Sequence, residues 1–216
     1  MSYVTSRGKN RGLTLVAIIA VTAAILILAT LALGAMSRAR ERSRRISCIC
    51  RLKQIGLGFR MWGNDHGGQF PWSVAQSNGG TFEFAMSTQV WRHFQVASNE
   101  LNSPKILVCP ADPARTRANF FVPPISNANI SYFVGLDADA TQPQSILSGD
   151  RNLTTNGVIA SGIISIQATT SVAWTTEFHR DGANIALGDG SAQQVSSAGL
   201  AKQLSSSPTA VRLSIP

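Results

Sequence analysis

An uncharged apolar run near the start of the chain constrains its fold more than any other feature. Residues 13–37 contain no Asp, Glu, Lys or Arg, and the apolar stretch reads LTLVAIIAVTAAILILATLALGAM. As an α-helix this stretch would be about 36 Å long, enough to cross the ~30 Å hydrocarbon core of a bilayer. A cleavable signal peptide is the alternative, with Ala32 and Gly34 at cleavage-site spacing, although its apolar region is usually only about 7–15 residues. We predict a basic leader at residues 1–12 and a transmembrane helix at residues 13–37.

Positive charge is concentrated around this run and does not form a basic face on the rest of the chain. The formal net charge is +8, but residues 1–53 hold ten of the 19 Lys and Arg against one acid, Glu41. Residues 54–216 hold nine basic and ten acidic residues and are nearly neutral. Charge that flanks an apolar span is typical of membrane topology, whereas nucleic-acid binding needs a basic surface. We therefore predict a membrane partner and no nucleic acid.

A helical pattern continues through residues 38–64 as an amphipathic extension. The segment contains no proline, and its apolar residues recur at spacings of four, three, four and three, which places them on one helix face. These residues are Cys48, Leu52, Ile55, Phe59 and Trp62. We predict that this stripe packs against a core, while Arg51, Lys53 and Arg60 stay in solvent.

The remainder, residues 65–216, is predicted to be a mostly-β globular domain. A short helix is expected within residues 82–97 and another at 197–204. Runs rich in β-forming residues predict strands at 106–109, 130–134, 157–165, 171–177, 183–187, 191–195 and 210–215. A long helix followed by antiparallel strands gives an α+β fold, in which the N-terminal helix packs on a C-terminal antiparallel sheet.

The start of the apolar run carries a motif of its own. Arg11, Gly12 and Leu13 are followed at once by apolar residues. This resembles the type IV prepilin signal, in which a prepilin peptidase cuts after a glycine and the new N-terminal residue is methylated. The resemblance implies processing between Gly12 and Leu13. The family usually has phenylalanine where this chain has Leu13, and glutamate where it has Ala17. In that family the glutamate supports entry into a filament, and this chain lacks it.

Two later motifs extend the resemblance over most of the chain. Val108-Cys109-Pro110-Ala111-Asp112 forms a cysteine-proline motif in mid-chain, and nine residues separate His179 from Asp189-Gly190. The ordered set is similar to pseudopilins of type II secretion, and more specifically to pseudopilin-like proteins of planctomycete and verrucomicrobial lineages. It implies a pilin-like fold in the cytoplasmic membrane, with prepilin peptidase and other pseudopilin subunits as partners.

Two sequence signals disagree about the side of the membrane on which the domain lies. Positive residues cluster more densely after the span than before it, which by the positive-inside rule favours a cytoplasmic domain. The resemblance implies the opposite: a cytoplasmic N-terminus and an extracytoplasmic domain. We follow the resemblance, because the cysteine pattern agrees with it.

The three cysteines predict one disulfide. Cys48 lies on the apolar stripe, Cys109 ends a predicted strand, and Cys50 lies about 200° round the helix from Cys48. In an extracytoplasmic domain, a Cys48–Cys109 bond would join helix to sheet and leave Cys50 free. Three reduced thiols are the alternative. The spacing Cys48-x-Cys50 without a second nearby pair does not predict zinc.

Other polar residues give no pattern for catalysis. His179 is followed by Arg180 and Asp181, but the other elements of a kinase site are missing, and His179 is expected to fix the turn before the last hairpin. Asp137-x-Asp139 is a fragment of a calcium loop, so calcium is an alternative to solvated loop acids. We predict no enzymatic activity, no cofactor and no resident metal. Two functions remain: a pseudopilin-like assembly subunit, or a membrane-anchored binding module that does not polymerise.

Overall fold

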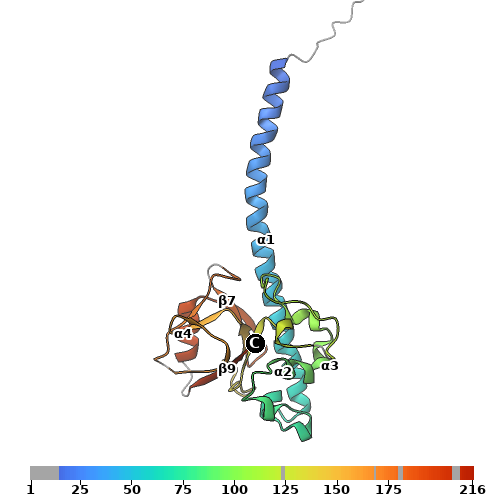
Figure 1. Ribbon diagram of the computed structural model, residues 1–216, viewed down its shortest axis with the longest axis vertical. Coiled ribbons are helices and arrows are strands. Elements are labelled where there is room, and N and C mark those ends of the chain that lie inside the picture. Colours follow the sequence, from blue (N-terminus) through green and yellow to red (C-terminus); the bar gives the residue numbers. More distant parts are fainter. Residues whose placement is uncertain (1–14, 123–124, 168, 180–181, 206–209) are drawn as a thin grey trace, which may run out of the picture. The chain divides into compact units, whose positions relative to one another are not determined.

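The computed structural model describes residues 15–122, 125–167, 169–179, 182–205 and 210–216 (Figure 1). The chain divides between Arg42 and Ser43 into two compact units. One long helix, α1 (Leu15–Asp65), supplies the described part of the first unit and the beginning of the second. The processing residues Gly12 and Leu13 lie outside the described residues.

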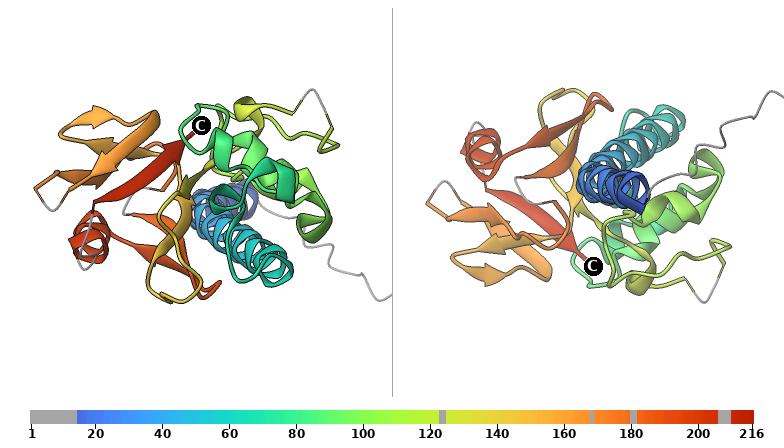
Figure 2. Two further views of the ribbon diagram at one scale, coloured as in Figure 1. Left: turned by 90° about the horizontal axis from the view of Figure 1, so that it is seen from below. Right: turned by 90° about the horizontal axis from the view of Figure 1, so that it is seen from above.

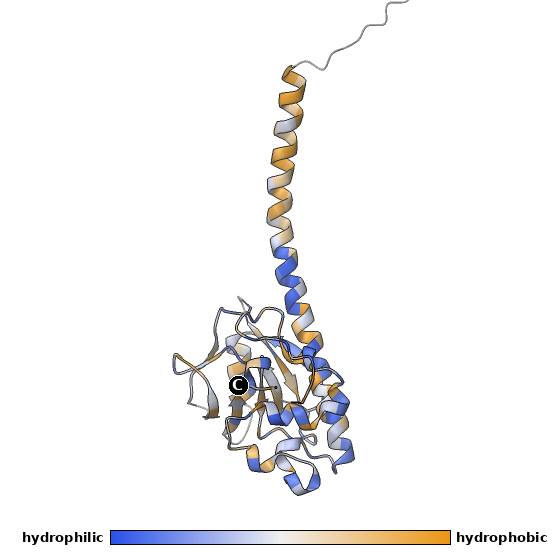
Figure 3. Cartoon of the chain, turned by 45° about the vertical axis from the view of Figure 1, so that its right-hand side comes forward, coloured by the Kyte–Doolittle hydropathy of each residue, from blue (hydrophilic) through white to orange (hydrophobic). Residues whose placement is uncertain are grey.

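The first part of α1, residues 15–36, is apolar on every side. Its large side chains are exposed from Leu15, at 75%, to Met36, at 51%, and Figure 3 shows apolar colouring along this part, followed by a hydrophilic stretch. The hydroxyls of Thr22, Thr30 and Ser37 donate to carbonyl oxygens three residues earlier. Among the described residues, α1 is the one helix that is long and apolar enough to cross a membrane. Its properties are those of a single-pass anchor.

The second part of α1, residues 43–65, buries one face. The predicted stripe is buried: Cys48, Leu52, Ile55, Phe59 and Trp62. The Phe59 ring centroid lies 5.3 Å from those of Trp72 and Phe94, so three aromatic rings pack together beside the stripe. The helix ends at Asp65, and Gly67 and Gly68, with φ angles of 67° and 80°, then reverse the chain. The amide of Gly68 donates to the carbonyl of Gly63, as in a glycine helix cap.

Short helical turns follow α1. They are η1 (Pro71–Ser73), η2 (Gln76–Asn78), η3 (Phe82–Phe84), α2 (Trp91–Val96), α3 (Ser98–Leu101), η4 (Pro104–Leu107) and η5 (Asn127–Asn129). The helix expected within residues 82–97 is present as η3 and α2. The strand predicted at 106–109 is wrong, because Pro104 begins a 3₁₀ turn there and the Ser103 side chain accepts a hydrogen bond from the Lys105 amide.

The rest of the chain forms two antiparallel sheets, which confirms the α+β fold. The strands are β1 (Tyr132–Gly135), β2 (Ile146–Asp150), β3 (Leu153–Thr155), β4 (Val158–Ile159), β5 (Gly162–Ile166), β6 (Val172–Trp174), β7 (Ala183–Leu187), β8 (Ala192–Val195) and β9 (Val211–Ile215). The larger sheet has the order β5-β9-β1-β2-β7-β8, and the smaller has the order β4-β3-β6. The strand predicted at 157–165 is split into β4 and β5, and no sequence pattern predicted β2 or β3.

The larger sheet is covered on both faces. Tyr132, Val134 and Leu147 belong to the core that contains the α1 stripe. Phe133 and Ile185 belong to a second core on the opposite face, which includes leucines of α4 (Ser197–Ser205). Neighbouring residues of β1 therefore point into different cores, as the pleat of a strand requires. Figure 2 shows α1 and α4 on opposite sides of these strands.

Candidate functional site

The Cys48–Cys109 disulfide joins α1 to the cysteine-proline loop, as the sequence predicted. Both cysteines are fully buried, and Cys50 is free and exposed. Cys109 follows η4 and does not end a strand. It begins a tight turn in which the Asp112 amide donates to the Cys109 carbonyl at 3.0 Å. The motif therefore places a sulfur against the helix and directs the chain away from it.

His179 lies beside this disulfide. Its Nε2 is 3.7 Å from Cys109 Sγ and 3.7 Å from Asp150 Oδ2, and the side chain is buried. His179 was expected to fix the turn before the last hairpin. The structure places its ring in a buried cluster with Cys48, Cys109 and Asp150, whose donor atoms all lie within 4.8 Å of one another.

Asp150 is the buried acid of the cluster. It ends β2 opposite Tyr132 of β1, and its Oδ2 accepts hydrogen bonds from the backbone amide of Asn184 at 2.8 Å and from Asn184 Nδ2 at 2.9 Å. Burial raises the pKa of Asp150 to about 7, although the Asn184 hydrogen bonds lower it. Asp150 Oδ1 has no hydrogen-bond partner within the described part of the chain.

A phenol and an ion pair complete the surroundings of the cluster. Burial raises the pKa of Tyr132, and the charges of Asp150 and Asp112 raise it further. Asp112, the last residue of the cysteine-proline motif, receives two hydrogen bonds from Arg151, at 2.9 and 3.0 Å. The Arg151 guanidinium also lies 4.9 Å from the centre of the Phe178 ring. A paired charge thus fixes the cysteine-proline loop to the end of β2.

Asp189 and Gly190 form a different contact. They turn the β7–β8 hairpin, where Gly190 has φ +82° and the Ser191 amide donates to Asp189 Oδ1 at 2.8 Å. Hydrogen bonds from the side chain and the backbone amide of Ser191 lower the pKa of Asp189. A Cβ on Gly56 of α1 would lie 3.3 Å from the Gly190 carbonyl oxygen, so helix and hairpin meet through two glycines.

Two arginines of α1 secure these contacts, which corrects a prediction. Arg60 Nη1 donates to the Gly188 carbonyl at 2.7 Å, and Arg51 Nη1 donates to the Val108 carbonyl. Both side chains are half-buried, whereas Lys53 is exposed as expected. Burial lowers the pKa of Arg51. The periodicity placed both arginines correctly off the stripe, but the loops that flank the stripe reach their guanidinium groups.

The acids considered for calcium have protein partners. Asp137 is ion-paired with Arg212, whose Nε lies 3.0 Å and 3.1 Å from the two carboxylate oxygens. Asp139 Oδ1 accepts hydrogen bonds from the amide and the hydroxyl of Thr141, both at 2.8 Å. These two side chains fix β9 and a loop turn.

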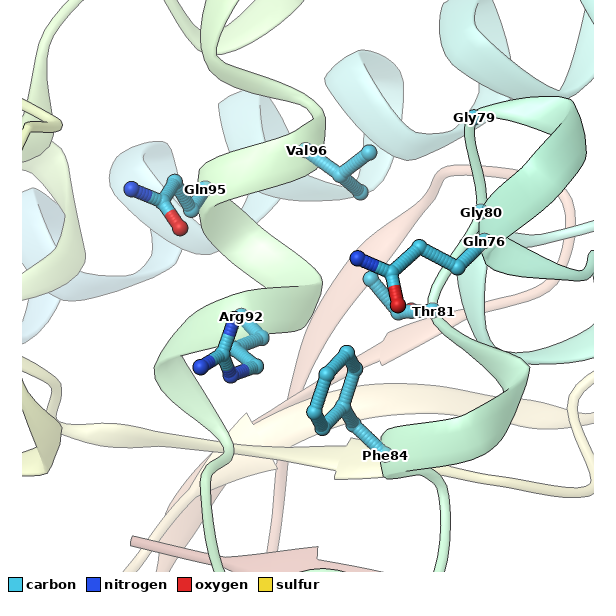
Figure 4. Close-up of a pocket in the computed structure, with 8 residues that line it drawn as sticks. All are labelled: Gln76, Gly79, Gly80, Thr81, Phe84, Arg92, Gln95 and Val96. Atoms are coloured by element: carbon cyan, nitrogen blue, oxygen red, sulfur yellow. The ribbon is translucent and has the colours of Figure 1, made fainter.

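A shallow pocket of about 360 Å³ lies between η2, η3 and α2 (Figure 4). Its lining is Gln76, Gly79, Gly80, Thr81, Phe84, Arg92, Gln95 and Val96. The Arg92 guanidinium lies 4.2 Å from the centre of the Phe84 ring, and Thr81 Oγ1 lies 2.7 Å from His93 Nδ1. Burial lowers the pKa of His93 to about 4, so this ring is neutral at pH 7. No motif marks these residues in the sequence, and their amides and guanidinium suit a small polar or acidic group.

A comparison with protein families finds similarity in the first half of the chain. Residues 37–94 match the model of a family described as protein of unknown function, DUF1559. The matched segment contains the second part of α1 and runs into α2, and it includes Cys48 but not Cys109, Asp150 or His179. Neither the curated proteins nor the solved structures contain a match. The family match is compatible with a pilin-like protein in general.

Proposed function

We propose that this chain is a membrane-anchored, pseudopilin-like structural subunit of a type II secretion or type IV pilus-like assembly. One observation carries the proposal: α1 is a single uninterrupted helix whose first part is apolar on all sides and whose second part packs one stripe on an antiparallel sheet. The same helix thus supplies both the apolar anchor and part of the core of the domain. The proposal includes no enzymatic activity and no nucleic-acid partner.

Processing of the N-terminus tests this proposal. A prepilin peptidase would cut between Gly12 and Leu13, and Leu13 would be N-methylated. The measurement is the intact mass of the chain purified from its native membrane, followed by fragmentation of its N-terminal peptide. A chain that begins with methylated Leu13 supports the proposal. A chain that begins at Ala35 would identify a secretory signal peptide and overturn it.

We further propose that the domain is extracytoplasmic and lies on the outer side of the cytoplasmic membrane. A buried disulfide between Cys48 and Cys109 fits an oxidising compartment. Cys50 provides the test, because it is exposed and free while the other two cysteines are bonded. A membrane-impermeant maleimide should label Cys50 in spheroplasts without lysis, and a Cys50→Ala chain should stay unlabelled. Labelling only after lysis would place the domain in the cytoplasm.

A membrane-anchored binding module that does not polymerise is the second candidate. It is favoured by Ala17, which stands within α1 where pilins usually carry a glutamate, and by the pocket around Arg92. In-membrane cross-linking distinguishes the two. Ladders of two or more chains support the assembly subunit, whereas monomers alone, at native expression and with the remaining assembly proteins present, support the module.

A further inference from the structure

The buried cluster around the disulfide has the composition of a metal site. We propose that, when the Cys48–Cys109 bond is reduced, Cys48, Cys109, His179 and Asp150 bind one Zn²⁺ ion. Two thiolates, an imidazole and a carboxylate are ligands that zinc accepts in four-coordinate sites. All four side chains are buried, and their donor atoms lie within 4.8 Å of one another.

Distances within the cluster match those between ligands of one ion. His179 Nε2 and Asp150 Oδ2 are 3.7 Å apart, beyond the roughly 2.7–3.2 Å of an N–H···O hydrogen bond. Zn–N and Zn–O bonds of about 2.0–2.2 Å at a tetrahedral angle put two such ligands roughly 3.3–3.6 Å apart. With a Zn–S bond of about 2.3 Å, a nitrogen and a sulfur lie roughly 3.6 Å apart, and the His179 Nε2–Cys109 Sγ distance is 3.7 Å.

The polar surroundings of the two sulfur atoms also support a zinc site. A disulfide needs no acid beside it, and burying a carboxyl oxygen without a hydrogen-bond partner is unfavourable. Yet Asp150 is fully buried here, and its Oδ1 has no hydrogen-bond partner among the residues that the structure describes. Asn184 holds the other oxygen with two hydrogen bonds, as outer-shell groups hold the ligands of a metal.

The redox chemistry balances with a dithiol as reductant. Thiol–disulfide exchange transfers two electrons from the dithiol to the Cys48–Cys109 bond, gives two protein thiols, and leaves the reductant as a disulfide. Zn²⁺ then displaces the two thiol protons. The sulfurs move apart to roughly 3.8 Å, the distance between two thiolates on one zinc ion, through rotation of their side chains. Reoxidation by a disulfide-containing oxidant reverses the exchange and releases the ion.

The ligands come from four separate segments, so no spacing motif announces the site. Cys48 belongs to α1, Cys109 to the cysteine-proline loop, Asp150 to β2, and His179 precedes β7. On this proposal, the cysteine-proline motif and the histidine of the second motif supply ligands to the same ion. Before oxidation, the metal would join α1 to the cysteine-proline loop. After oxidation, the disulfide would join them.

The test uses the full-length chain in detergent, prepared in parallel with the disulfide reduced or intact and freed of metal by a chelator. Co²⁺ is the spectroscopic probe, and Zn²⁺ is the competitor. The reduced chain should bind one Co²⁺ with thiolate-to-cobalt charge-transfer absorption and the visible bands of tetrahedral cobalt, and one equivalent of Zn²⁺ should abolish them. The oxidised chain should show none of these bands.

Variants separate this site from a trivial thiol site. Cys50→Ser should leave the bands unchanged, while Asp150→Asn and His179→Ala should weaken Zn²⁺ competition at least tenfold. Zn²⁺ should also raise the denaturant midpoint of the reduced wild-type chain and not that of the oxidised chain. No cobalt–thiolate band in the reduced wild-type chain would overturn the proposal, whether or not the variants fold. Loss of the band in Cys50→Ser would likewise overturn it.

Discussion

The two parts of α1 are one helix in two different surroundings. In the first part, apolar side chains are exposed on every side, including Ile25 at 58% and Leu28 at 66%. In the second part, the apolar residues that recur at helical spacing are buried against the domain. The other faces carry mostly charged and polar residues, with Ile46, Leu57 and Met61 as exposed apolar exceptions. The comparison shows that apolar content alone does not tell what covers a helix. The angular distribution of the apolar residues does: all round for lipid, one stripe for protein.

The largest effect should come from placing charge in the first part. Ile25→Arg/Leu28→Arg introduces two charges that each cost about 2.5–3.5 kcal/mol at the centre of a membrane span. We expect the variant to be lost from the membrane fraction, as measured by carbonate-extracted membranes and immunoblotting. The matched control is Ile46→Arg/Met61→Arg, at positions that are each 55% exposed in the second part. Equal loss of both variants would mean that the two parts share one environment.

Truncating the stripe should have the next largest effect. Phe59 is fully buried between Trp72 and Phe94, so Phe59→Ala should lower the free energy of unfolding by about 3–5 kcal/mol. All four tryptophans lie after residue 43, so their fluorescence in a urea titration reports on the globular unit. Met61→Ala, on the exposed face, should change stability by less than about 0.5 kcal/mol. Similar small changes in both would show that the stripe is not a core face.

Removing the disulfide should cost about 4 kcal/mol. The bond closes a loop with a sequence separation of 61, and the chain-entropy model gives roughly this value for such a loop. We expect Cys48→Ala/Cys109→Ala to unfold at a lower urea concentration by the same fluorescence measurement. Cys50→Ala, which removes the exposed thiol, serves as the control and should match the wild type. A stable double variant would imply that the stripe and the other contacts of α1 hold the helix on the domain without the disulfide.

Titration of Asp150 should lower the free energy of unfolding by about 2 kcal/mol between pH 5 and pH 7. Its pKa is raised in the folded chain to about 7, from 3.8, so the folded state holds a proton that the unfolded state loses first. Stability is therefore greatest below about pH 4 for this group and falls as pH rises toward 7. Asp150→Asn should flatten the difference in urea midpoint between pH 5 and pH 7. An unchanged slope would mean that Asp150 does not titrate in this range.

Arg60→Ala should have the smallest effect, about 1 kcal/mol. It removes one half-buried hydrogen bond to the Gly188 carbonyl. Lys53→Ala, on the exposed part of the helix, is the control and should change stability by less than about 0.5 kcal/mol. If the two variants are equivalent, the contact between Arg60 and the hairpin contributes nothing measurable.

Periodicity explains which parts of the fold were predictable. The α1 stripe, the hairpin strands β7 and β8, and the helix α4 follow from regular spacing and from turn residues such as Gly190. β2 was not predicted, because Gly149 and Asp150 are poor strand formers. Gly149 is nevertheless required, since a Cβ there would lie 2.6 Å from the Phe133 ring. A tertiary contact, not a local preference, selects that residue.

The candidate site was predictable only in part. The Cys48–Cys109 bond could be inferred because Cys48 falls on the buried stripe. The approach of His179 and Asp150 to it could not, because it depends on the register in which β2 pairs with β1 and β7. Sequence spacing does not encode such a register directly.

A nitroxide scan along α1 tests the central claim most directly. In a Cys50→Ala chain reconstituted in lipid vesicles, single cysteines between residues 18 and 64 would be spin-labelled, and collision rates with oxygen, which partitions into lipid, would be measured. We predict uniformly high oxygen access over the first part and an oscillation with a period of about 3.6 residues over the second, with minima at the stripe. The same oscillation through both parts would show that the first part is packed against protein, and would contradict the account of α1 as a lipid anchor joined to a docked helix.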